Sequence, residues 1–215
     1  EQGGYLESLK KNFIQEMIEE TAAKRDMNIA TRRELLLGTN QYPNAQEMIL
    51  GEYTPAAKTT QDKAEFKTMK KYRGAEAFEQ LRLATEKSGK KPVVFLLTYG
   101  NLTWRKARAG FASSFFACAG YEIIDNNGFE SIEEGVKAAF EKNADIIVLC
   151  SSDEEYQVSA PLTKNLINDK ALLVVAGYPR EILDELKNKG IQNFIHVKSN
   201  LLEELTNFNK KLGIQ

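Results

Sequence analysis

Three short segments carry the side chains best suited to binding or catalysis, and each directly follows an apolar run. They are Gly100–Thr103, Cys150–Asp153 and Gly177–Tyr178. Continuous apolar runs bounded by chain breakers are typical of strands buried on both faces of a parallel sheet. Because the loops at the carboxyl ends of such strands face the ligand crevice of an open α/β sheet, these three segments define the candidate site.

Two common sites of open α/β sheets do not fit these segments. A phosphoacceptor receiver domain needs a carboxylate cluster after its first strand, but Gly100–Thr103 contains no acid, and Asp153 lies beyond two serines. A dinucleotide site needs a Gly-x-Gly-x-x-Gly pattern between strand and helix. No second glycine follows Gly100 before Gly110, so the sequence does not support that site either.

Two further kinds of site depend on a few polar residues. A nucleophilic triad is not indicated, because the single histidine, His196, falls in an apolar run that predicts a core or edge position. Thr98, Asn101 and Thr103 offer hydroxyl and amide groups near a helix N-terminus, where phosphate groups bind, so an FMN phosphate nest stays a minor alternative. Short polar loops of this kind usually cap a helix, and we expect Thr103 to do so.

The elements that position these segments follow from a regular alternation of apolar runs and helical patterns after Lys91. We expect strands at Val93–Leu97, Tyr121–Ile124, Asp145–Cys150, Leu172–Ala176 and Phe194–Val197. We expect helices near 103–119, 132–142, 154–168, 180–189 and 200–212. Five such units predict an α/β fold, a flavodoxin-like doubly wound parallel sheet in the order 2-1-3-4-5.

The first part of the chain predicts a different organisation. Residues 5–30 place apolar side chains at three- and four-residue spacing, which is typical of an amphipathic helix, and Glu34–Gly38 favours a short strand. One helix and one strand cannot close a core, so we expect this region to dock onto other structure. Residues 45–60 predict a linker, and 62–87 predict a charged helical stretch with a possible interruption at Gly74.

Composition narrows the function classes. The 215 residues carry 29 basic and 30 acidic side chains, so there is no basic excess to indicate a nucleic-acid partner. Cys118 and Cys150 lie in apolar segments without metal-ligand spacing, so we expect reduced core thiols. No apolar run approaches the ~18 residues of a membrane span, and no signal peptide is recognised, so we expect a cytoplasmic protein. The first residue, Glu1, is not methionine, which is compatible with a fragment of a longer protein.

Long stretches of the sequence are distinctive enough to compare with a known family. Glu1–Asn44 includes GGYLESLKKNFIQEMIEETAAKRDMNIATRRELLLGTNQYPN, and Arg73–Glu86 reads RGAEAFEQLRLATE. With residues 92–215, these stretches resemble methylmalonyl-CoA mutase, most closely its small (β) subunit. The resemblance implies a C-terminal fragment of the substrate-binding TIM barrel at 1–44, a linker with a charged helix at 45–91, and a flavodoxin-like, cobalamin-binding-like domain at 92–215.

The resemblance also gives the first segment a specific comparison. In the family's catalytic subunits, an Asp-x-His-x-x-Gly motif follows the first strand of this domain, its histidine binds cobalt, and its aspartate orients that histidine. Counting back from Gly120 puts Thr103 at the aspartate, Arg105 at the histidine and Arg108 at the glycine. A protonated arginine has no lone pair for a metal, so the resemblance implies that this ligand is lost.

The other two cobalamin segments are altered as well. The family's Gly-x-Ser-x-Leu segment falls on residues 148–152, where Val148, Cys150 and Ser152 replace its three defined residues. Its Gly-Gly pair falls on Gly177 and Tyr178, and we expect the tyrosine to fill the groove of the nucleotide tail. The eight positions therefore form a degenerate crevice, with no catalytic, cofactor-binding or metal-binding residue expected in this chain.

The resemblance leads to one preferred function and two alternatives. We expect part of the small subunit of a heterodimeric methylmalonyl-CoA mutase, which is not itself catalytic and stabilises a large subunit that carries adenosylcobalamin. That enzyme interconverts methylmalonyl-CoA and succinyl-CoA. Phe13, Met17 and Ile18 are candidates for packing in the barrel. The alternatives are a domain that binds cobalamin without a histidine ligand, and a sensor that binds a small ligand in the same crevice.

Overall fold

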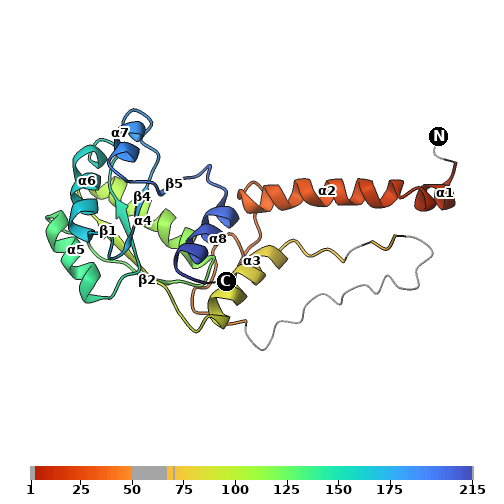
Figure 1. Cartoon of the computed structure of the whole chain (residues 1–215), viewed down its shortest axis with the longest axis horizontal. Coiled ribbons are helices and arrows are strands. Elements are labelled where there is room, and N and C mark those ends of the chain that lie inside the picture. Colours follow the sequence, from red (N-terminus) through yellow and green to blue (C-terminus); the bar gives the residue numbers. More distant parts are fainter. Residues whose placement is uncertain (1–2, 50–66, 70, 215) are drawn as a thin grey trace.

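The computed structural model describes residues 3–49, 67–69 and 71–214, and its largest part is built on a five-stranded parallel sheet (Figure 1). The strands are β1 (Val93–Thr98), β2 (Glu122–Ile124), β3 (Ile146–Cys150), β4 (Leu172–Ala176) and β5 (Phe194–Ile195). Their order is β2-β1-β3-β4-β5, and all neighbouring strands pair in parallel. The predicted flavodoxin-like α/β fold and its strand order are confirmed.

Helices cover both faces of the sheet. They are α3 (Glu76–Lys87), α4 (Leu102–Ala117), α5 (Ile132–Glu141), α6 (Tyr156–Ile167), α7 (Leu183–Asn188) and α8 (Leu201–Lys211). Val94 and Leu96 of β1 belong to one buried cluster with α3, α4 and α8, whereas Phe95 and Leu97 belong to a second with α5, α6 and α7. Because successive strand side chains point to opposite faces, one apolar run supplies two cores.

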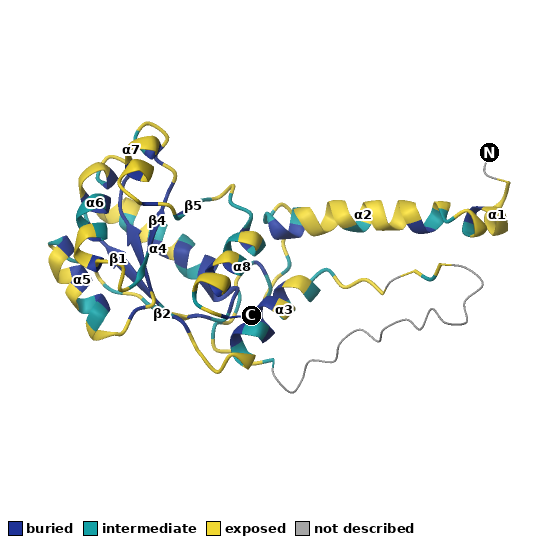
Figure 2. Ribbon diagram, viewed as in Figure 1, coloured by how far each residue is buried: buried dark blue, intermediate teal, exposed yellow. Residues whose placement is uncertain are grey.

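The N-terminal helical region extends away from the sheet (Figures 1 and 2). The helix predicted for residues 5–30 is two helices, α1 (Tyr5–Lys10) and α2 (Phe13–Ala30). Asn12 separates them in the left-handed conformation, with φ of 61°. Only the last turn of α2 enters the core, through Ile29, so most of this helix is open to solvent.

Two other predictions for this part of the chain need correction. Glu34–Gly38 is not a strand, because the loop folds around the buried Asn40. The Asn40 side chain accepts the Leu36 N–H at 2.8 Å and donates to the Ile29 carbonyl at 2.8 Å, which leaves only an isolated bridge at Leu37. Of the charged helix predicted at 62–87, residues 76–87 are helical and 67–69 and 71–75 are not; residues 62–66 and 70 lie outside the described residues.

Helix α3 holds residues 44–49 against the sheet domain through hydrogen bonds. The buried Arg82 donates to the backbone carbonyls of Asn44 and Glu47, the latter at 2.8 Å. The Glu86 carboxylate accepts the Ile49 N–H at 3.0 Å.

No helix among the described residues is long and apolar enough to cross a membrane.

Candidate switch-point site

The candidate site lies at the carboxyl ends of β1 and β3. This is the topological switch point, where the strand order of the sheet reverses. On the β1 side, Asn101 begins α4, and its side-chain oxygen accepts the N–H groups of Thr103 at 3.0 Å and Trp104 at 3.3 Å. Asn101 is therefore the N-cap, and the prediction that Thr103 caps this helix was wrong. An Asn side chain reaches the second and third N–H groups of a following helix, which is the bond a cap must make.

The carboxylate of Glu155, the residue that precedes α6, fills the space between the two loops. Glu155 Oε1 accepts the Asn101 N–H at 3.3 Å, and Oε2 accepts the Ser152 N–H at 3.1 Å. The hydroxyl of the buried Ser151 lies within hydrogen-bond distance of Oε2 and of the Tyr99 carbonyl. Burial by itself raises the pKa of Glu155, but the Ser151 hydroxyl and these backbone donors together hold the pKa below its ordinary value.

Gly100 allows this close approach. Its φ is +74°, and a Cβ added there would lie 2.1 Å from Glu155 Oε1. Only glycine adopts this conformation readily while leaving room for a neighbouring group. The glycine at the end of β1 is thus explained by a side chain of this same protein.

Tyr156 fills the neighbouring space between the ends of β3 and β4. Its side chain is fully buried, and its hydroxyl donates to the Ala176 carbonyl at 2.8 Å and accepts the Ser151 N–H at 3.1 Å. Burial strongly raises the pKa of this phenol, so it stays protonated and neutral. A Cβ at Gly177 would lie 3.0 Å from the Tyr156 ring, so Tyr156 also explains why a small residue follows β4.

The two arginines of the first segment turn towards neighbouring loops. Arg105 donates to the Gly100 carbonyl at 3.3 Å and to the Asn127 carbonyl at 3.1 Å. Arg108 forms an ion pair with Asp153 at 2.9 Å. Both guanidinium groups therefore tie loops of this chain together across the edge of the sheet.

The three positions of the second segment are buried or nearly so. Val148 and Cys150 lie within β3 with no exposed surface, and Ser152 follows the strand. Burial strongly raises the pKa of the Cys150 thiol, so the thiol is protonated at neutral pH. These residues belong to the core and to the N-terminus of α6.

Tyr178 lies beside β5 rather than between β1 and β3. Its ring is 4.6 Å from that of His196 and makes an edge-to-face contact with Phe194 at 6.4 Å, measured between centroids. Partial burial lowers the pKa of His196, and the positive charges of Lys198 and Arg180 lower it further. The histidine sits just past β5, and its Nδ1 accepts the Lys198 N–H, so at neutral pH it is an uncharged ring that packs at an angle against Tyr178.

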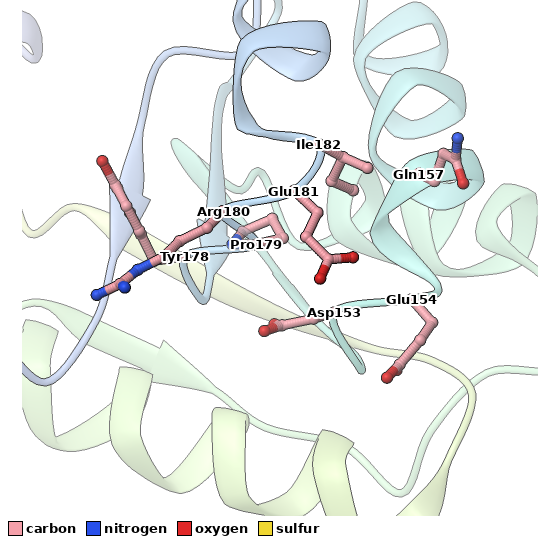
Figure 3. Close-up of a pocket in the computed structure, with 8 residues that line it drawn as sticks. All are labelled: Asp153, Glu154, Gln157, Tyr178, Pro179, Arg180, Glu181 and Ile182. Carbon is pink, nitrogen blue, oxygen red and sulfur yellow. The ribbon is translucent and has the colours of Figure 1, made fainter.

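A pocket of about 600 Å³ opens beside this site, between the loops that follow β3 and β4 (Figure 3). It is lined by Asp153, Glu154, Gln157, Tyr178, Pro179, Arg180, Glu181 and Ile182. In Figure 3 the Glu181 carboxylate points towards the loop that carries Asp153, which gives this side of the pocket an acidic wall. Among the described residues, no group of three or more His, Cys, Asp or Glu side chains is arranged to hold a metal ion.

Sequence reasoning identified the correct loops but missed the two side chains that occupy them. Arg105, Arg108, Ser152 and the adjacent serine do come together around the ends of β1 and β3, whereas Tyr178 does not join them. The contact of Glu155 could have been predicted, because Ser152 and Glu155 have the Ser-x-x-Glu spacing of a capping box. In that motif the glutamate accepts the N–H of the serine. No sequence pattern predicts the position of Tyr156, since it depends on packing between two strands.

Comparison with known proteins adds the family. Residues 1–99 match the family model described as methylmalonyl-CoA mutase. The chain is 50% identical to the methylmalonyl-CoA mutase small subunit of Porphyromonas gingivalis, in an alignment that covers 99% of this chain and 35% of that protein. It is 28% identical to the probable methylmalonyl-CoA mutase small subunit of Mycobacterium tuberculosis, over 98% of this chain and 33% of that protein.

A third relative agrees with these two. The methylmalonyl-CoA mutase small subunit of Streptomyces virginiae is 28% identical over 80% of this chain and 28% of that protein. The chain thus spans about a third of the length of the curated relatives it matches. With similarity along nearly its whole length and a family model that matches its first 99 residues, the chain belongs to the methylmalonyl-CoA mutase family.

Proposed function

We propose that this chain is part of the small subunit of a heterodimeric methylmalonyl-CoA mutase and provides a non-catalytic, cytoplasmic domain. In this proposal the large subunit holds adenosylcobalamin and interconverts methylmalonyl-CoA and succinyl-CoA. The small subunit pairs with it and stabilises it, which suits a reaction whose reactive intermediates must be kept from water and side reactions. The observation that carries the non-catalytic role is the filling of the switch-point crevice by Glu155 and Tyr156.

The residues at the crevice do not fit a cobalamin. The position of the cobalt-binding histidine is Arg105, whose guanidinium offers no lone pair and is bonded to the carbonyls of two loops. The backbone donors at the ends of β1 and β3 already bond to Glu155, and the buried Tyr156 ring takes up the space beside Gly177. A nucleotide tail would have to displace both side chains.

The N-terminal helices supply the second argument. Phe13, Met17 and Ile18 lie on α2 with exposed fractions of 37%, 54% and 42%. Apolar side chains that recur on one helix and stay exposed are typical of an interface. This supports the expectation that residues 1–44 pack into a larger structure, as the closing elements of a barrel would.

A titration with cobalamin tests the non-catalytic assignment. Adenosylcobalamin and hydroxocobalamin are added separately to the intact chain while the corrin absorption spectrum and the heat of binding are followed. We expect an unshifted spectrum and no heat. A spectral shift with saturable heat would support the alternative of cobalamin binding without a histidine ligand.

Size-exclusion chromatography tests the partner assignment. The small subunit that contains this sequence is mixed with its large subunit, and we expect one co-eluting species with equal amounts of both. Separate elution at micromolar concentrations would exclude a stable heterodimer. A triple variant with Phe13, Met17 and Ile18 changed to serine distinguishes packing within the barrel from pairing with the large subunit. Barrel packing predicts a folding defect in the small subunit before any loss of pairing.

The acidic pocket supports a second candidate, a small-ligand sensor. Its carboxylates favour a cationic or hydroxyl-rich ligand over a phosphate-bearing one. A thermal-shift screen of amines, polyols and nucleotides with the intact chain tests this role. A ligand that stabilises the chain, and loses its effect when Glu181 is changed to Gln, would establish it.

A further inference from the structure

The strongest unexplained feature outside the family comparison is the way a single carboxylate is bound by two separate loops. Glu155 receives one N–H from the loop after β1, through Asn101, and one from the loop after β3, through Ser152. The Ser151 hydroxyl is within bonding distance of the same Oε2 atom, and Ser151 has no exposed surface. These donors converge on one point from different elements, as they do in sites that bind phosphate.

The backbone around this point has the form of an anion site. Gly100 has a φ of +74°, and its Cα approaches the carboxylate so closely that a Cβ would lie within 2.3 Å of Glu155 Cδ and of both carboxylate oxygens. The same point lies at the N-termini of α4, which has 16 residues, and of α6, which has 12. Both helix dipoles therefore place partial positive charge next to the carboxylate.

Neighbouring carboxylates do not share this environment. Asp153 pairs with Arg108 across the mouth of the crevice, and Glu154 is exposed. The donors from both loops meet at Glu155 alone among the acidic residues of this loop. The environment is thus built around the position of one side chain.

We propose that the ends of β1 and β3 form an oxyanion-binding nest, that the Glu155 carboxylate is its internal occupant, and that removing this carboxylate makes the nest bind a free oxyanion of the phosphate class. Glu155 is then the residue that closes this crevice to phosphate-bearing ligands. This inference concerns donors within the chain, so it holds or fails independently of the partner subunit and of cobalamin.

Thermal unfolding with inorganic phosphate tests the proposal. The intact wild-type chain, Glu155→Ala and Glu154→Ala are compared in phosphate and in chloride at matched ionic strength and pH 7. Phosphate should raise the Tm of Glu155→Ala by about 2–5 °C more than chloride does, because a ligand that binds only the folded state stabilises it. Wild type and Glu154→Ala, which keep the nest occupied, should show no difference between the two salts.

Two results would overturn the proposal. One is a folded Glu155→Ala chain, with a wild-type circular dichroism spectrum, that responds equally to phosphate and chloride. The other is a phosphate-specific Tm rise of the same size in wild type and in Glu154→Ala, which would place the anion elsewhere on the surface.

A measurement on wild type keeps the proposal testable if Glu155→Ala does not fold. The amide resonances of Asn101 and Ser152 are followed by NMR between pH 7 and pH 2.5. If both N–H groups bond to Glu155, they should move together in one titration step, and that step should be absent from the amide of Ser114, inside α4, a helix with no acidic residue. Amides that do not move, or that follow two separate steps, would show that the carboxylate does not occupy the nest.

Discussion

The sheet domain and the N-terminal helices use apolar residues in opposite ways. In the sheet domain, Leu97 and Phe116 have no exposed surface, whereas Met17 and Tyr5 in the N-terminal helices are 54% and 72% exposed. Figure 2 shows most of α2 in the colour of exposed residues. The first region closes its own core on both faces of a sheet. The second reaches the core only through the end of α2, so its remaining apolar side chains need another surface.

The difference teaches where each region obtains its stability. A helix in water gains most of its stability from tertiary packing of one face, and isolated helices are marginal. α2 makes that packing mainly at Ile29, while α4 makes it along much of its length, through Ala109, Ala112 and Phe115. Matched substitutions in the two regions can break or sharpen this contrast.

The largest effect is expected from a pair of identical substitutions. Phe116→Ala removes a ring that contacts Phe115, Tyr121 and Phe208, and it should lower the free energy of unfolding by about 3–5 kcal/mol. In the 215-residue chain by itself, where Phe13 is 37% exposed, Phe13→Ala in α2 should change it by less than about 0.5 kcal/mol. Urea unfolding followed by circular dichroism measures both values. Equal losses would mean that α2 is packed against the rest of the described chain more closely than its exposure indicates.

A smaller effect is expected inside the sheet domain, where α3 packs against α8. Asn209 of α8 accepts a hydrogen bond from the Tyr121 hydroxyl at 2.5 Å and donates one to Thr85 of α3 at 3.3 Å, inside the core. Asn209→Ala leaves the Tyr121 donor unpaired, so it should lower the free energy of unfolding by about 1–3 kcal/mol.

The control for this prediction lies on the same helix. Asn207 is exposed, so Asn207→Ala should change stability by less than about 0.5 kcal/mol. Hydrogen exchange of the α3 amides gives a second measurement, because α3 should lose protection in Asn209→Ala. Unchanged exchange in α3 would show that this network does not hold α3 to the sheet domain.

The smallest effect is expected at Glu155 and depends on pH. Its pKa is lowered in the folded chain from an ordinary value of 4.5, so its stabilising contribution is complete above that value and is lost as the pH falls through the folded pKa. Glu155→Gln should therefore be less stable than wild type by about 1 kcal/mol at pH 7, since hydrogen bonds to a charged acceptor are replaced.

The stability difference between these two chains should shrink as the pH is lowered below 4.5. Urea titrations at pH 7, 5, 4 and 3 measure it. Glu130→Gln is the control, because Glu130 is an exposed carboxylate in the loop that precedes α5. A difference that grows on acidification would contradict the hydrogen-bonded carboxylate.

The sequence predicted the sheet domain well because its signals are local. Each strand is an apolar run and each helix begins or ends at a polar breaker, so both the strand order and the crevice could be anticipated. The errors occurred where a single side chain decides the backbone. Asn12 divides the first helix, and Asn40 organises a loop whose sequence pattern is typical of a strand. Asn101 is the N-cap residue of α4, the role expected of Thr103.

The candidate site was predicted only in outline for the same reason. The three loops follow from the positions of the strands, but the side chains between them depend on contacts among residues far apart in the fold. Tyr156 meets Ala176 across two strands, and Glu155 meets Asn101, which lies 54 positions earlier. Such contacts have no periodicity, so hydrophobic patterns do not reveal them.

Because Glu155 belongs to the same chain as the nest, its carboxylate has an advantage over a dissolved anion in the competition for the nest. An attached group is present at an effective concentration fixed by geometry, while a free anion contributes only its actual concentration. Here only two residues lie between Ser152 and Glu155, and three between Ser151 and Glu155. Fluctuations in cellular phosphate should therefore leave the domain unaffected, and a change of ligand specificity at this crevice would have to begin with the loss of one side chain.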